Sequence, residues 1–371
     1  MKRLSPSTTT DISRRAVGRW LLLGVVMIVI QIILGGITRL TGSGLSITEW
    51  QPILGAFPPM NDDAWQIAFE KYKGIAQYRY VNAHFTLNDF KAIYFWEWLH
   101  RDWARIGLAL VFAIGFLYFL RKRYFQRDMV VSLLILFVLG GLQGAVGWIM
   151  VQSGLNDTDL YVSHIRLMVH FMVALVLLCY TLWFAMKLLI GGEKAVFLPG
   201  LRSFTTVCIV ILGLQLIYGA FMAGLKAAPV APTWPTMNGL WVPDQILQYG
   251  GRSYSGLDAY ISHPVAVQFI HRCLAYSLLG IIIAWTIVAN RYAERHRLNF
   301  LKSWSRWPLV CVAVQVALGI LTVLSGGSAN SGNWGTFETL ALAHQLIAVC
   351  LLMALFANLY LLGRPVQTPQ P

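Results

Sequence analysis

Apolar runs of about 20 residues recur eight times along the chain, and they restrict its fold more than any other feature. A helix needs about 20 apolar residues to cross the hydrocarbon core of a bilayer, because each residue adds about 1.5 Å to its length. We therefore predict an all-α polytopic membrane protein with eight transmembrane helices. The predicted spans are residues 17–37, 95–120, 129–151, 162–189, 203–224, 265–290, 307–325 and 338–362.

The chain carries a formal net charge of +13, and the position of the basic residues explains this charge. They are not gathered into one patch, which argues against a nucleic-acid partner. Most of them lie in short segments next to the spans, at 2–19, 121–127, 187–202, 291–306 and 364. The positive-inside rule places this face and both termini in the cytoplasm. We therefore expect a multi-pass protein of the bacterial inner (cytoplasmic) membrane, surrounded by lipid.

Every even-numbered span contains a histidine five to eight residues inside its outer end, and the spacing of these four histidines repeats. His100 and His170 are 70 residues apart, and His271 and His344 are 73 apart. Every odd-numbered span contains a glutamine followed four residues later by a glycine. These pairs are typical of close helix packing with interhelical hydrogen bonds, or they line a cofactor pocket. They are Gln31/Gly35, Gln143/Gly147, Gln215/Gly219 and Gln315/Gly319.

The repeated pattern predicts two tandem four-helix bundles, at 1–190 and 191–371. Each half has an even number of spans, so the halves should be related by a pseudo-two-fold axis along the membrane normal. In each half the first outer loop is long, at about 38–94 and 225–264, and the second is short, at 152–161 and 326–337.

A ligating side chain at membrane depth is a functional candidate, and imidazole is the usual axial ligand of haem iron. We predict two haem sites, one with iron ligands His100 and His170 and one with ligands His271 and His344. Counting from the helix starts puts each histidine about 8 to 12 Å deep in the outer half of the membrane. The other histidines are expected in loops or, for His164, at the solvated mouth of a span.

One carboxylate distinguishes the two predicted sites. Glu97 lies three residues before His100, on the same helix face, and Gln268 takes the equivalent position before His271. A carboxylate near a haem edge can take a proton or stabilise developing positive charge, whereas an amide only forms hydrogen bonds. The asymmetry indicates that the N-terminal site carries out chemistry and that the C-terminal site transfers electrons.

Two arginines directly follow these histidines, Arg101 after His100 and Arg272 after His271. A guanidinium is a natural bidentate partner for a haem propionate, so both are candidate anchors. The alternative is that they are interfacial arginines whose charged groups extend toward water, and that Glu97 merely pairs with Arg101 or Arg105.

Four segments of the chain resemble the haem A synthase family, and the resemblance covers nearly the whole length with all eight spans in register. They are KAIYFWEWLHR at 91–101, GGITRLTGSGLS at 35–46, FIHR at 269–272 and AHQ at 343–345. Some members carry a cysteine pair in the first outer loop. All five cysteines of this chain lie within spans, so it resembles the proteobacterial and mitochondrial branch that lacks the pair. His164 stands where members commonly have proline, and nothing in the sequence explains it.

The resemblance implies an oxidoreductase that oxidises the C8 methyl of haem O to the formyl group of haem A by successive hydroxylations. It implies that His271 and His344 ligate a resident haem b, and that Glu97, His100 and His170 form the site for the substrate haem O. Arg39 is a further candidate to hold a propionate, and a loop-stabilising role is its alternative. A haem O synthase, an unidentified electron acceptor and a second copy of the chain are hypothetical partners.

Two rival functions explain the histidines as well. A two-haem cytochrome b that exchanges electrons with quinone needs the same four ligands, but it is usually expected to place its haems toward both membrane faces. A transporter built on parallel repeats would use the histidines as a relay, but it should carry more acidic residues within the spans.

Overall fold

The computed structural model describes residues 6–50, 54–190, 196–244, 248–329 and 334–363. Within them the chain divides into two compact units, Met1–Ala185 and Met186–Pro371. Lys2, Arg3, Lys194 and Arg364, which contribute to the predicted topology, lie outside the described residues.

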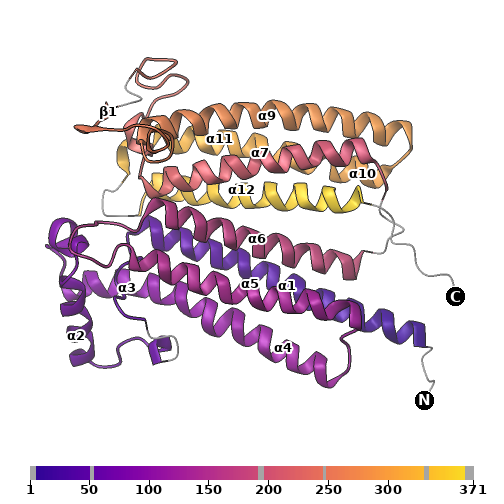
Figure 1. Cartoon of the computed structure of the whole chain (residues 1–371), viewed down its shortest axis with the longest axis horizontal. Helices are drawn as coiled ribbons and strands as arrows, with labels where there is room; N and C mark the ends of the chain where they lie inside the picture. The colour runs from indigo at the N-terminus through magenta and orange to yellow at the C-terminus, as the bar shows by residue number, and fades with distance from the viewer. Residues whose placement is uncertain (1–5, 51–53, 191–195, 245–247, 330–333, 364–371) are drawn as a thin grey trace. The chain divides into compact units, whose positions relative to one another are not determined.

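The first unit contains four membrane-length helical segments that run side by side (Figure 1). α1 is followed in the long loop by the short helix α2, and the second segment consists of three consecutive helical stretches, α3, η3 and α4. α1 packs against all three of them. The bounds are α1 Pro6–Leu40, α2 Asp62–Lys73, α3 Leu87–Asp102, η3 Trp103–Leu108, α4 Ala109–Arg121, α5 Arg127–Gln152 and α6 His164–Leu189.

The second unit contains four further segments, and each packs against two neighbours in a closed ring. α7 contacts α9 and α12, while α11 contacts α9 and α12. The short elements lie in the long loop or beside α11. The bounds are α7 Pro199–Gly224, β1 Gln248–Tyr249, β2 Arg252–Ser253, α8 Asp258–Ile261, α9 Pro264–Arg295, α10 Asn299–Trp304, α11 Arg306–Leu324 and α12 Thr336–Leu361.

The predicted fold class is confirmed: eight described helical segments are long and apolar enough to cross a membrane. The two-fold relation between the halves stays a prediction. Several helices begin or end beyond the predicted spans because polar residues cap them outside the apolar run. Thr86 and Asp89 form a capping box that starts α3 at Leu87, and the His263 side chain accepts from the Ala266 amide at the start of α9.

The first long loop of the first unit folds into a packed outer cap, which we define as α2 together with the start of α3. Its core joins Phe69 and Tyr72 of α2 to Phe90 and Tyr94 of α3. The Tyr72 hydroxyl donates to Gln77 and accepts from Asn82, and burial raises the pKa of Tyr72 to about 12, so the donor keeps its proton. The cap was not predicted, because α2 lies in a region that we expected only to be a loop.

The helices α1 and α4 approach closely at Gly115. A Cβ atom there would overlap the Trp20 ring. This ring also packs against the rings of Phe112 and Phe119, with centroid separations of 5.2 and 5.5 Å. We predict that Gly115→Ala destabilises the protein by about 1–3 kcal/mol through overpacking. Thermal unfolding in detergent measures the effect.

Gly140→Ala is the matched control, because nothing lies within 4 Å of a Cβ at Gly140. It should leave the melting temperature unchanged or raise it, since alanine favours a helix over glycine. An equal loss in both variants would contradict the close approach.

Candidate functional site

Each of the four histidines lies against the glutamine of the preceding long helix. The amide nitrogen of that glutamine is within hydrogen-bond distance of an imidazole nitrogen in every case. The pairs are Gln31–His100 at 3.2 Å, Gln143–His170 at 3.3 Å, Gln215–His271 at 3.3 Å and Gln315–His344 at 3.1 Å. The repeated glutamines therefore contact the candidate ligands directly.

The glycine of each pair lies beneath the same imidazole ring. A Cβ atom on these glycines would come within 2.8 to 3.3 Å of the histidine Cε1. At Gly147 and Gly319 the distance is below 3.0 Å and the ring would have to move, whereas at Gly35 and Gly219 the contact would be tight. We call the repeated arrangement the Gln–Gly–His contact. Its glycines are Gly35 for His100, Gly147 for His170, Gly219 for His271 and Gly319 for His344. Glycine is needed here because it admits a ring where a side chain would stand.

In the second unit, the rings of His271 and His344 lie close together in an edge-on arrangement. Their centroids are 6.4 Å apart and their planes differ by 73°. An imidazole nitrogen lies about 1.1 Å from its ring centroid and about 2.0 Å from a bound metal, so two rings on opposite sides of one metal ion have centroids about 6.2 Å apart. The observed separation fits a single iron between the two rings.

The hydrogen bonds beside these rings also suit ligation. Nδ1 of His344 lies 3.1 Å from the backbone oxygen of Gln315, a contact that places the ring proton on Nδ1. Nε2 then carries the lone pair that a metal would need, and in this structure it lies 3.1 Å from the Gln315 amide nitrogen. Among the described residues, the Oε1 atoms of all four contact glutamines are buried without a hydrogen-bond partner, as is Nδ1 of His271. Unsatisfied buried polar atoms need an explanation, and a bound group in the pocket supplies one.

The donor set favours haem over a simple metal ion. Nowhere in the described residues do three or more His, Cys, Asp or Glu side chains gather as a metal site. A protein zinc site takes three or four protein ligands, whereas haem iron receives four nitrogens from its own macrocycle and needs only two axial ligands. Two histidines on separate helices match the second requirement.

Glu97 is buried and holds the chain that follows α1. Its carboxylate accepts from the Ser46 hydroxyl at 2.7 Å and the Ile47 amide at 2.8 Å, and the Arg101 guanidinium lies 2.5 Å away. Arg101 also donates to the Ile47 carbonyl oxygen at 3.1 Å. The alternative pairing of Glu97 with Arg101 therefore occurs, and the carboxylate receives three donors in all.

The second unit uses the equivalent residues in the same way. Gln268 donates to the Ala231 carbonyl at 3.0 Å, and Arg272 donates to the Ala231 and Thr236 carbonyls at 2.8 and 3.2 Å. In the first unit the loop presents hydrogen-bond donors, and the helix carries the acceptor Glu97. In the second unit the loop presents a carbonyl oxygen, and the helix carries the donor Gln268. Arg101 and Arg272 thus anchor the long loops over the histidines.

The remaining candidates lie at the same end of the helices. Arg39 is one turn beyond Gly35 on α1 and so shares a face with the residue that contacts His100. His164 is the first residue of α6. His263, expected in an outer loop, ends the long loop before α9 as the buried N-cap of that helix, with the ring centroid of Tyr254 4.6 Å from its own.

A π-helical segment that begins three residues after His100 is a further difference between the two units. The turn Trp103–Leu108 is π-helical between α3 and α4, whereas α9 continues as α-helix past His271. π-Helical turns are rare and frequently occur at functional sites. No sequence pattern predicted this turn.

Comparison with known proteins shows the family to which the chain belongs. A family model described as a cytochrome oxidase assembly protein (COX15-CtaA) matches residues 18–356. The chain is 39% identical to a heme A synthase of Cereibacter sphaeroides over 91% of this chain and 85% of the relative. It is 40% identical to a heme A synthase of Flavobacterium psychrophilum (82% and 88%) and 39% identical to one of Paracoccus denitrificans (91% and 86%).

The Gln–Gly–His contact predicts that Gly319→Ala releases the group bound between His271 and His344. The added Cβ would stand 2.9 Å from Cε1 of His344 and push the ring off its position. We expect the haem content of the purified protein to fall several-fold, because changes to residues that orient a metal ligand cost about 10- to 100-fold in metal affinity. The ratio of Soret absorbance to protein measures it.

Gly213→Ala is the control within the same unit, since a Cβ there has nothing within 4 Å. It should keep full haem content. Full content in Gly319→Ala as well would show that the glycine does not position the ligand.

Proposed function

Because the chain belongs to the cytochrome oxidase assembly protein family (COX15-CtaA), we propose that it is a haem A synthase, an oxidoreductase that converts haem O to haem A. In the reaction the C8 methyl of the porphyrin is oxidised to a formyl group by successive hydroxylations. The observation that carries the proposal is the fourfold Gln–Gly–His contact, which prepares histidine ligands in both units.

The two units take different roles in this proposal. The second unit holds a resident haem b through His271 and His344, whose spacing of 6.4 Å suits one iron. When bound, this haem supplies a redox centre through which electrons enter or leave. The first unit binds the substrate haem O at His100 and His170. The buried glutamate and the π-helical turn beside His100 have no equivalent in the second unit, and both support the assignment of chemistry to the first unit.

The protein's own part in the reaction is positioning, exclusion of water and charge. His100 and His170 orient the porphyrin so that the reacting methyl is fixed. The segment after α1 is tied to α3 by the bonds from Ser46 and Ile47 to Glu97 and packs against the outer cap, and we infer that together they exclude water from the site. Glu97 stabilises positive charge that develops on the substrate or takes its proton. Arg39, on the helix face that contacts His100, is a propionate anchor.

The chain is a multi-pass membrane protein. We place it in the bacterial inner membrane with both termini in the cytoplasm, because its basic residues cluster at that end of the helices. Its further partners are a haem O synthase that delivers the substrate, an electron acceptor and a second copy of the chain. The long isoprenoid tail of haem O requires an opening between helices toward the lipid.

The test of the function is the identity of the haems extracted after expression in cells that supply haem O. The wild-type protein should yield haem A or a hydroxylated haem O together with haem b. Glu97→Gln should keep haem b and lose both products, because the amide keeps one acceptor for the loop but carries no charge. Alanine is the poorer choice, since it removes both acceptor oxygens and leaves the Ser46, Ile47 and Arg101 donors without any acceptor at this position.

Ser46→Ala separates chemistry from loop anchoring. It removes the hydroxyl that donates to Glu97 and leaves the carboxylate in place. It should keep most of the product yield. A loss equal to that of Glu97→Gln would reduce Glu97 to a loop anchor, and two equivalents of haem b without any product would instead favour an electron-transfer cytochrome.

A further inference from the structure

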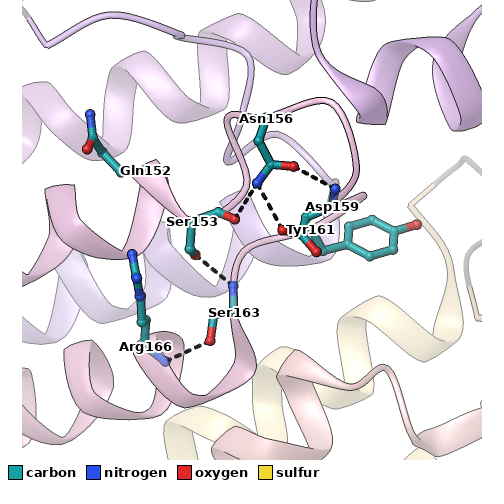
Figure 2. A pocket seen from close by; sticks show the side chains of 7 residues that line it. All are labelled: Gln152, Ser153, Asn156, Asp159, Tyr161, Ser163 and Arg166. Atoms are coloured by element: carbon teal, nitrogen blue, oxygen red, sulfur yellow. Dashed lines mark hydrogen bonds between the residues drawn. The ribbon is translucent and has the colours of Figure 1, made fainter.

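We propose that Arg166 binds a propionate carboxylate of the substrate haem in the first unit; this inference rests on the proposed function. Arg166 lines a polar pocket of about 450 Å³ between the end of α5 and the start of α6 (Figure 2). Ser153, Asn156 and Ser163 contribute to its walls. Sequence reasoning did not select this arginine.

The position of Arg166 connects the pocket to the predicted ligand. It lies four residues before His170, so both side chains are on one face of α6 and one turn apart. Its Nη1 donates to the Ile149 carbonyl at 2.9 Å, in the last turn of α5. Two residues earlier on α5, Gly147 contacts the His170 ring. The guanidinium is therefore held at the mouth of the His170 site.

Arg166 also has binding capacity to offer. A guanidinium has five N–H donors, and the bond to Ile149 uses one of them. Among the described residues Arg166 is in no ion pair, and its side chain is exposed to the pocket. Asp159, the acidic residue of the pocket, accepts from the Asn156 amide at 2.9 Å on the side away from the guanidinium (Figure 2). The remaining N–H donors of the planar guanidinium can form two parallel hydrogen bonds to a carboxylate.

Two comparisons favour Arg166 over the arginines next to the histidines. Arg101 and Arg272 both donate to loop carbonyls, and Arg101 also pairs with Glu97. The position equivalent to Arg166 in the second unit, four residues before His344, is Leu340. The extra cation thus belongs only to the unit assigned to the substrate. An open, charged pocket suits a ligand that must enter and leave, whereas a resident cofactor has no such need.

The experiment measures binding apart from turnover. The full-length protein, purified in detergent with its tightly bound haem, is titrated with haem b and with the dimethyl ester of haem b, whose propionates are uncharged. Arg166→Gln should weaken the second binding event for haem b about tenfold, the scale of one charge-assisted hydrogen bond. It should leave the affinity for the ester unchanged. Arg252→Gln, which removes an exposed loop arginine, should affect neither probe.

Other outcomes overturn the inference. Unchanged affinity for haem b in Arg166→Gln excludes the contact, and an equal loss for haem b and its ester assigns Arg166 a structural role. An equal loss of affinity for haem b in Arg252→Gln would show that the effect comes from the net charge of the protein and not from a contact with Arg166. The proposed function fails separately, if the wild-type protein shows no second binding event or if His100→Ala leaves that event intact.

Discussion

The contact between a histidine ring and the glutamine and glycine of the neighbouring helix is the interaction on which the rest of the site depends. It brings the two helices close enough for the glycine to lie under the ring, and it places an amide beside the ring nitrogens. A ligand held in this way loses little freedom when iron binds, because its orientation is fixed beforehand. The contact occurs twice in each unit, so both units place their histidines in the same way.

The residues next to the histidines link the site to the outer loops. Glu97 and Arg101 in the first unit, and Gln268 and Arg272 in the second, bind the chain that follows the preceding helix. These hydrogen bonds join each long loop to the helix turn next to the histidine. Glu97 joins three parts of this arrangement, because its carboxylate accepts from the Ser46 hydroxyl and the Ile47 amide and pairs with Arg101.

Much of this could be predicted because the relevant patterns are local. Eight apolar runs and one histidine in every second run predicted the spans and the candidate ligands, and the quoted motifs predicted the family, which the comparisons confirm. The glutamine–glycine pairs were visible as a repeat with two interpretations, and only the helix packing showed that they contact the histidines. The outer cap and the partners of Arg101 and Arg272 were not predicted, since they depend on loop backbone positions that no short motif encodes.

The sequence by itself determined that the chain crosses a membrane and which residues can ligate haem, because both follow from hydropathy, spacing and side-chain chemistry. The tertiary structure decided which groups meet: the neighbouring rings of His271 and His344, the loop bound by Glu97, and the pocket around Arg166. The physical reason is that helix formation is local and periodic, whereas such contacts join residues far apart in the chain and depend on helix rotation and separation.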